Sequence, residues 1–333
     1  MQHLQRRNSF RLLVLLFLLI LLLVVLVASC CLGAYEADLA TVFRVIFSDH
    51  ESTAHKIIFN VRVARNLVAA CAGLCLALSG AILQGVMQNP LASPNIIGVS
   101  SGAGLGAMMV LVVAPHLSYL LTPVAFLAGL ATTILIYTLS YKNGINPLYM
   151  VLAGIAVSSL LSAFNRAILI FYSDRVQSAL GFMVGSLASR TWVHFRMIWP
   201  YAFFGLIIAF LLSGKLNILT LGDDMAKGLG LKVNLARTVF IMLASLLAAA
   251  SVSVVGILGF VGLIVPHIAR IIIGSDYRFL FPASALMGAT LVVLCDTVSR
   301  LIFLPMEIPV GISLSIIGVP FFLYLLRRRK HIA

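Results

Sequence analysis

The chain has 333 residues, of which 62% are hydrophobic and only 10% are charged. Soluble globular domains carry about 25% charged residues, so this composition excludes a soluble enzyme or binding domain and indicates a polytopic membrane protein. The formal net charge of +13 would suggest a nucleic-acid partner in a soluble protein, but membrane topology explains much of it. The five cysteines lie in apolar runs and form no C-x-x-C pair, so neither a disulfide framework nor a zinc site is indicated.

The first half of the chain predicts five membrane-spanning helices, each needing about 20 apolar residues to cross a bilayer. Arg6, Arg7 and Arg11 precede the first apolar run and place the N-terminus in the cytoplasm. That run is too long for the hydrophobic part of a typical signal peptide and lacks a clear A-x-A cleavage site, so we interpret it as a retained span. Residues 66–141 contain no Asp, Glu, Lys or Arg, which leaves room for three spans separated by proline-containing breaks. The expected spans are residues 12–35, 66–87, 95–113, 120–141 and 147–172.

The second half predicts five further spans, so that the whole chain, 1–333, is one transmembrane domain of about ten helices with both termini in the cytoplasm. This topology puts most Lys and Arg residues on the cytoplasmic side, as the positive-inside rule requires. The outer face still carries more basic than acidic residues, which favours an acidic docking partner there, with anionic lipid as the alternative. The expected spans are residues 197–214, 237–255, 256–273, 282–300 and 308–326.

Residues 216–237 form the longest polar interruption in the second half of the chain. A segment this charged cannot lie in hydrocarbon, so we expect it on the cytoplasmic face. Its paired aspartates are typical of the first turn of a short helix that ends at Gly228, and a second helix is expected from Lys232 into the next span. The pattern predicts a compact helix–turn–helix knob, with an ordinary interhelical loop as the alternative. Its charged residues are Asp223, Asp224, Lys227, Lys232 and Arg237.

Polar amides gather where the second expected span ends, at Gln84, Gln88 and Asn89, beside a break that contains Pro90 and Pro94. Amides at a broken helix within a bilayer are typical of a lined cavity or gate. We therefore take Gln84 and Gln88 as candidates for lining a transport pathway. The many glycines nearby allow close helix packing, and their spacing matches neither a Walker A loop nor a dinucleotide fingerprint.

Several motifs follow one another along most of the chain. They are S-G-A-I-L-Q at 79–84, N-P-L-A-S-P at 89–94, I-G-V-S-S-G-A at 97–103, L-G-D-D-M-A-K-G-L-G-L-K-V at 221–233, G-F-V-G-L-I-V-P-H-I-A-R at 259–270, D-T-V-S-R at 296–300, E-I-P-V-G at 307–311 and I-G-V-P-F-F at 317–322. In this order the motifs resemble the permease subunits of the iron–siderophore, haem and vitamin B12 import family. Two positions depart from that family: Ala64 replaces the proline common in its R-x-P-R motif, and Cys295 stands where alanine is usual.

The resemblance implies an all-α permease with the type II ABC importer fold, a multi-pass protein of the bacterial cytoplasmic (inner) membrane. It implies a transport subunit and not an enzyme, working beside a second permease that is identical or paralogous. Two cytoplasmic ATPase subunits would supply the energy, and an extracytoplasmic binding protein would deliver the cargo. The chain itself is expected to bind no cofactor and no metal, because ATP and Mg²⁺ belong to the partner ATPase. Membrane lipid surrounds it, and no nucleic-acid partner is expected.

The resemblance also assigns roles at the two membrane faces. It implies that Arg62, Arg65 and Arg300 dock the binding protein, which suits arginine because its guanidinium pairs with carboxylates in a bidentate way. For Arg300 the alternative is an ion pair with Asp296, four residues earlier on the same helix face. The spans lining the pathway are expected to be mainly the fifth and tenth, with a contribution from the second. The cytoplasmic gate of the family corresponds to two turns, Asn89, Pro90 and Leu91, and Asn146, Pro147 and Leu148.

Within the cytoplasmic coupling loop, 216–237, the resemblance implies contact with the ATPase. The apolar residues Met225, Ala226, Leu229 and Leu231 have little membrane to face, so we expect them to be available for a protein groove. The alternative is that they pack onto the ends of the sixth and seventh spans. The coupling residues are expected to be Gly222, Asp223, Asp224, Met225, Ala226, Lys227, Gly228, Leu229 and Gly230.

The implied cargo is a bulky metal chelate, a ferric siderophore first, with haem, vitamin B12 and oxyanions such as molybdate as alternatives. A mostly apolar pathway suits a chelate handed over intact, because a bare metal ion would require carboxylates or thiolates. An intramembrane enzyme or a proton-coupled carrier is a remote alternative. It would need more polar groups within the spans than the single carboxylate of Asp296. We interpret His267 as a packing or interface residue, since no second ligand lies at metal-binding spacing.

Overall fold

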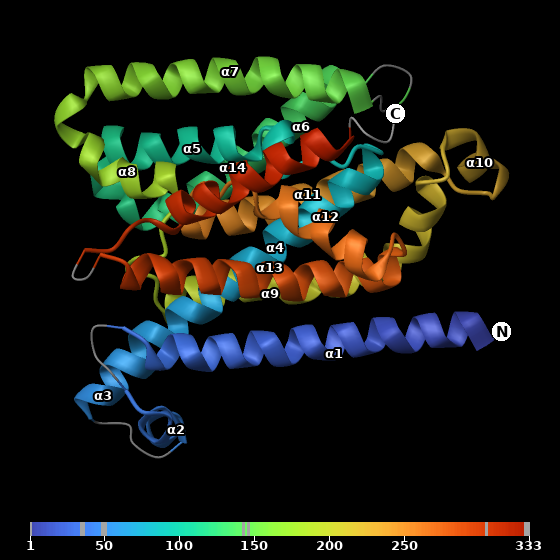
Figure 1. Cartoon of the computed structure of the whole chain (residues 1–333). Coiled ribbons are helices and arrows are strands. Elements are labelled where there is room, and N and C mark those ends of the chain that lie inside the picture. Colours follow the sequence, from blue (N-terminus) through green and yellow to red (C-terminus); the bar gives the residue numbers. More distant parts are fainter. Residues whose placement is uncertain are drawn as a thin grey trace.

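The computed structural model describes residues 2–33, 37–47, 52–141, 144, 147–303 and 306–329. Across these ranges the chain is a bundle of helices joined by turns, so the predicted all-α membrane fold is confirmed (Figure 1). In this part of the chain seven helical segments are long and apolar enough to cross a membrane, and three shorter apolar segments accompany them. The long segments contain α1 (Gln2–Cys31), α4 (Ala64–Val86), α6 (Leu121–Ser140), α7 (Pro147–Phe171), α9 (Trp192–Leu219), α11 (Val233–Val255) and α13 (Tyr277–Leu301).

The shorter apolar segments contribute the remaining helices of the bundle. They are α5 (Val99–Met108) with its continuation η3 (Met109–Val113), α12 (Val261–Ile273) and α14 (Val310–Arg329). Small helices connect the long ones or extend them at their ends. They are α2 (Leu39–Phe47), α3 (Thr53–His55), η1 (Lys56–Val63), η2 (Pro94–Ile97), η4 (Pro115–Leu120), η5 (Ser173–Arg175), α8 (Val176–Val184) and α10 (Asp223–Gly228).

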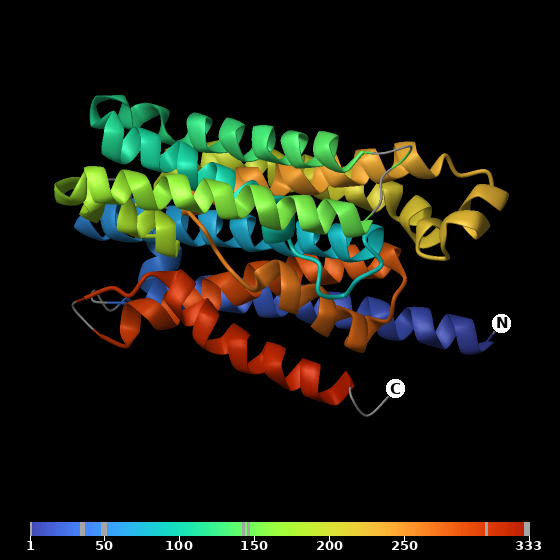
Figure 2. The ribbon, with the colours of Figure 1, turned by 90° about the horizontal axis from the view of Figure 1, so that it is seen from above.

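The two ends of the bundle carry different elements. The start of α1, the end of α14 and α10 lie toward the same end of the bundle, whereas α2, α3 and α8 lie toward the other (Figure 1). Figure 2 shows the start of α1 and the end of α14 toward one end again in the view from above. The positive-inside prediction places the chain ends and the α10 loop on the cytoplasmic side, and their shared position agrees with it. We therefore call the end that carries α10 the cytoplasmic end and the opposite end the outer end.

The interior of the bundle is organised around α4, which packs against α9, α11, α12 and α13. Nearly every residue of α4 from Val68 onward is buried. Two glycines permit this close packing, because a Cβ on Gly73 would collide with the backbone carbonyl of Gly288, and one on Gly80 with that of Gly262. The expectation that glycines of this region serve helix packing therefore holds for Gly80.

The junction between α11 and α12 differs from the expected continuous pair of spans. Helix α11 ends at Val255, the next residue, Gly256, has a φ of +80° that favours glycine, and α12 begins only at Val261. The intervening segment instead packs against α8, where the Ile257 N–H donates to the Phe182 carbonyl at 3.0 Å. Because this hydrogen bond joins residues far apart in the sequence, hydropathy gave no signal for it.

Candidate functional site

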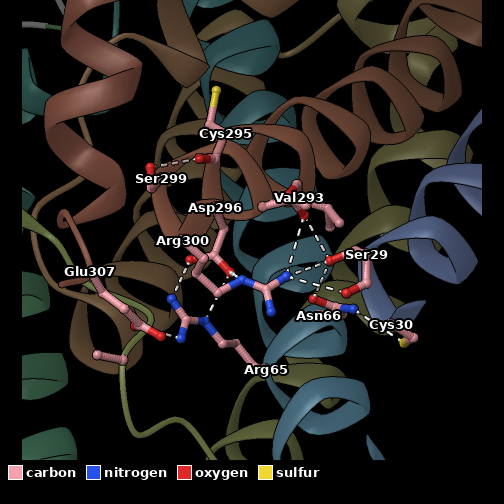
Figure 3. Close-up of polar contacts among 12 residues, drawn as sticks. Ser29, Cys30, Arg65, Asn66, Val293, Cys295, Asp296, Ser299, Arg300 and Glu307 are labelled. Carbon is pink, nitrogen blue, oxygen red and sulfur yellow. Dashed lines mark hydrogen bonds and ion pairs between the residues drawn. The ribbon is translucent and has the colours of Figure 1, made fainter. Parts of the chain in front are cut away.

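A cluster of ionic side chains joins α4 to α13 at the outer end of the bundle (Figure 3). Arg65, on the first turn of α4, donates from Nε and Nη2 to the two carboxylate oxygens of Asp296, each at 2.8 Å. Its third nitrogen, Nη1, donates to Glu307 Oε2 at 2.8 Å. The side chain of Asp296 is 1% exposed, whereas that of Glu307, in the connection between α13 and α14, is 42% exposed. All three guanidinium nitrogens of Arg65 are therefore engaged within the chain.

Arg300 extends the cluster to the first helix. Its Nε lies 3.4 Å from Asp296 Oδ2, so the ion pair expected from their four-residue spacing is present. Its Nη2 donates to Ser29 Oγ at 2.7 Å, and Ser29 Oγ in turn donates to Asn66 Oδ1 at 2.9 Å (Figure 3). These contacts tie α1, α4 and α13 together at one level of the bundle.

Arg62 lies in η1, directly before α4, and serves the end of α1. Its Nη1 donates to the carbonyls of Cys30 at 2.8 Å and Cys31 at 3.3 Å. The last carbonyls of a helix have no partner within that helix, so a cation placed there stabilises it. Arg62, Arg65 and Arg300 are thus all buried and bonded within the chain. Their role in docking a binding protein stays a prediction.

The two turns of the expected gate lie near the cytoplasmic end. The first turn follows α4, where the Leu91 N–H donates to Asn89 Oδ1 at 3.0 Å and Pro90 is partly exposed. The second turn leads into α7, which begins at Pro147, and the next residue, Leu148, is exposed. Asn146 lies outside the described residues. The gating role of these turns stays a prediction.

The two glutamines chosen as pathway candidates bond to backbone carbonyls of neighbouring helices. Gln84 is buried between α4 and α12, where Nε2 donates to the Leu263 carbonyl at 3.1 Å. Gln88 is exposed, has a φ of +48°, and donates to the Leu219 carbonyl at the end of α9 at 3.1 Å. These bonds give both amides a structural role, and their contribution to a pathway stays a prediction.

A cavity of about 550 Å³ lies near the outer end between α8 and α14. It is lined by Met183 and Val184 of α8, by Ile257, and by Ile312 and Ser315 of α14. The sequence directed attention to the fifth and tenth spans but singled out none of these residues. These residues come together only because α8 packs against α14, so no local sequence motif could have predicted the cavity.

The α10 loop forms the compact knob that the sequence predicted. Two aspartates begin α10, Gly222 and Gly230 flank it with φ of +99° and +81°, and Arg237 on α11 binds Asp223 through two hydrogen bonds of 2.7 and 3.0 Å. This bidentate pair fixes α10 to the start of α11. The glycines at positive φ close the turns without steric strain.

The apolar side chains of the knob divide into two sets. Met225 and Leu229 are exposed, as expected for residues available to a partner. Ala226 is fully buried and Leu231 packs against the core, so for these two the alternative, packing onto the neighbouring helices, is what the structure contains. Exposed Leu221 and Leu235 flank the knob and were missed. Leu221 lies two residues before the paired aspartates and Leu235 lies between Lys232 and Arg237, so an apolar side chain within a charged segment was the signal that could have found them.

Comparison with known proteins identifies this architecture. A family model described as the FecCD transport family matches residues 20–328 of the chain. The chain belongs to the FecCD transport family. This permease is 37% identical over 328 residues to the Fe(3+)-citrate import system permease protein YfmD of Bacillus subtilis, with 98% of each chain covered. It is also 37% identical over 279 residues to the cobalamin import system permease protein BtuC of Halobacterium salinarum, covering 84% of this chain and 75% of that one.

A solved structure, described as an inward-facing conformation of a metal-chelate type ABC transporter, matches the permease with a TM-score of 0.85. The two are 33% identical, and the match covers 94% of this chain and 98% of the other. The protein is therefore a multi-pass ABC importer permease of the cytoplasmic membrane. The prediction of a transport subunit and not an intramembrane enzyme is confirmed.

Proposed function

We propose that this permease imports a ferric chelate of the citrate or siderophore class, handed over by an extracytoplasmic binding protein and moved by cytoplasmic ATPase subunits. The observation that carries the proposal is the similarity to the Fe(3+)-citrate permease YfmD, which extends over 98% of both chains. A match of this extent includes the outer end, the spans and the α10 loop, which together form the machinery of an importer.

The exposed face of α7 supports a pathway between two permease copies. Ile155, Ser159 and Arg166 are exposed and recur at spacings of four and seven residues, so they share one face of this helix. Charged residues within membrane spans almost always face a bundle interior or a water-filled cavity. A face that combines Ser159 and Arg166 suits a second permease and a wet pathway better than it suits lipid. Arg166 also offers a positive charge to an anionic ferric chelate.

The cavity between α8 and α14 supports a bulky cargo. Its volume of about 550 Å³ falls within the usual range of about 300–1,000 Å³ for sites that bind small organic ligands. Its lining is largely apolar, with Ser315 as a hydroxyl partner. Such a lining makes only weak contacts with an intact chelate. It does not withdraw the metal ion from its organic chelator, because it offers none of the carboxylates or thiolates that bare metal ions prefer.

The α10 loop supplies the surface proposed for the ATPase. Met225 and Leu229 project from the cytoplasmic end, while the Asp223–Arg237 ion pair holds their helix against α11. Exposed apolar side chains on a rigid helix fit a groove of a partner protein. A push on α10 would pass directly to α11 through this pair.

Reconstitution tests the proposed function. The permease is placed in proteoliposomes with its cognate ATPase and binding protein, and ATP hydrolysis and uptake are measured with ferric citrate, a ferric hydroxamate, haem, cobalamin and molybdate. We expect a ferric chelate to stimulate both hydrolysis and uptake most strongly. Stimulation by cobalamin alone would instead assign the cargo of the BtuC relative, and stimulation by molybdate alone would overturn the chelate proposal.

A further inference from the structure

Glu307 differs from the other members of the outer cluster in its exposure. Asp296, with a side chain 1% exposed, is enclosed by two arginines, whereas the side chain of Glu307 is 42% exposed at the edge of the cluster (Figure 3). Both carboxylates bind the same guanidinium, Asp296 through Nε and Nη2 and Glu307 through Nη1 of Arg65. Arg65 therefore has one partner that is locked in place and one that solvent can reach.

This difference decides which partner can be exchanged. Separating Asp296 from Arg65 would leave a buried charge without compensation, which is strongly unfavourable. Separating Glu307 from Arg65 costs less, because this carboxylate is already partly hydrated, but it leaves Nη1 of Arg65, whose side chain is 8% exposed, in need of another acceptor. A carboxylate arriving from outside could bind Nη1 in place of Glu307 and keep the charge of the cluster unchanged.

Glu307 is also connected to the start of α14, which begins three residues later at Val310. In this connection the Ile308 N–H donates to the Ser299 carbonyl at 3.4 Å, and the Ser313 and Ser299 hydroxyls lie 2.7 Å apart. Further along, the Gly311 N–H donates to the Gly185 carbonyl at 3.1 Å, next to the cavity between α8 and α14. Release of Glu307 would remove the ionic contact that holds this outer end of α14 to α4.

From these contacts we infer that Glu307 is an internal competitor for a carboxylate of the binding protein. When the binding protein docks, its carboxylate replaces Glu307 on Arg65, and the segment that leads into α14 is freed from α4 next to the cavity between α8 and α14. Docking is thereby linked to movement of the segment around Glu307, which leads into a helix that lines this cavity. The inference rests on the proposed function, since it requires an acidic docking partner at the outer end.

Affinity for the binding protein tests the competition. The permease in nanodiscs, with its ATPase, is titrated with the cognate binding protein at low and at moderate salt. Glu307→Gln keeps the shape of the side chain and removes its charge, so it should tighten binding about two- to fivefold, the contribution of a partly exposed ion pair. Glu307→Asp, with a shorter reach, should give an intermediate gain.

Asp174→Asn is the matched control, because Asp174 is an exposed carboxylate at the outer end beyond the cluster. It changes the net charge of that face by the same amount and should leave the affinity nearly unchanged, since surface charges are screened. Equal affinities of Glu307→Gln and Asp174→Asn would overturn the competition, although the proposed function would stand. Failure of the parent permease to bind the binding protein at all would instead overturn the proposed function.

Movement of the segment around Glu307 is tested separately with a spin label. Met306 precedes Glu307 and is 73% exposed, whereas the native cysteines are buried or half-buried, so Met306→Cys should be labelled preferentially. We expect the label to become more mobile when the binding protein is added to the parent, and to be mobile beforehand in Glu307→Gln. A spectrum that the binding protein leaves unchanged in the parent would show that docking does not release this connection.

Discussion

Asp296→Asn is expected to weaken the outer end of the bundle severely. Asp296 accepts two hydrogen bonds of 2.8 Å from Arg65 and forms an ion pair with Arg300, and its own side chain is 1% exposed. Asparagine has nearly the same shape but no charge. The variant therefore leaves two buried guanidinium groups with Glu307 as the remaining carboxylate of the cluster.

The size of the effect follows from the burial of the pair. Removing one partner of a buried ion pair costs about 3–5 kcal/mol. With an unfolding entropy of about 2.1 cal/mol/K per residue, a chain of 333 residues should lose roughly 4–7 °C in unfolding temperature. The measurement is the thermal loss of the monodisperse peak of the detergent-solubilised permease in size-exclusion chromatography.

Two companion variants make this test specific. Glu307→Gln removes a partly exposed partner of the same arginine and should cost less than about 1 kcal/mol. Adding Arg300→Met to Asp296→Asn restores the charge balance, so the double variant should recover part of the lost stability. If Asp296→Asn unfolds at the parent temperature, the ionic cluster does not stabilise the outer end and the reasoning is refuted.

Three further predictions concern transport. Leu229→Asp should fold and insert normally, because Leu229 is exposed, and should lose ATPase association measured by co-purification. Cysteines at Leu91 and Leu148 should cross-link across the permease pair in one nucleotide state and not in another, as seen on non-reducing gels. Arg166→Gln should reduce uptake of an anionic ferric chelate several-fold in proteoliposomes, because it removes an exposed positive charge from α7.

Each of these has a control elsewhere in the described structure. The control for Leu229→Asp is Ser275→Asp, which adds the same negative charge at the cytoplasmic end outside the knob. If Leu229→Asp and Ser275→Asp lose ATPase association equally, the knob is not a specific coupling surface. The control for the cysteines at Leu91 and Leu148 is a cysteine at exposed Leu139 on α6, which should give no cross-linked permease pair. The control for Arg166→Gln is Arg196→Gln, which removes an exposed positive charge from α9. If the two variants reduce uptake equally, Arg166 has no specific role in attracting the anionic chelate.

The sequence was sufficient for the membrane fold and for the knob on its cytoplasmic face. A span must satisfy its backbone hydrogen bonds internally, so an apolar run of sufficient length is necessarily a helix, and this can be recognised locally. The α10 loop could also be predicted from short-range signals. Asp223 and Asp224 favour the start of a helix and Gly230 favours a turn, and each affects only the backbone within a few residues. The three outer arginines were singled out by the resemblance to the permease family, and their positions next to the ends of the expected spans agreed with it.

Tertiary structure alone decided which partners those charges have. Spacing along one helix pairs Asp296 with Arg300, yet the shortest bonds of Asp296 go to Arg65, 231 residues away. Arg65 reaches Glu307 across a separation of 242 residues, and Ala226 is buried although its neighbours are exposed. A buried charge binds whichever opposite charge the packing brings within hydrogen-bond distance. That packing depends here on backbone contacts such as Gly73 against Gly288, which no segment of the sequence contains by itself.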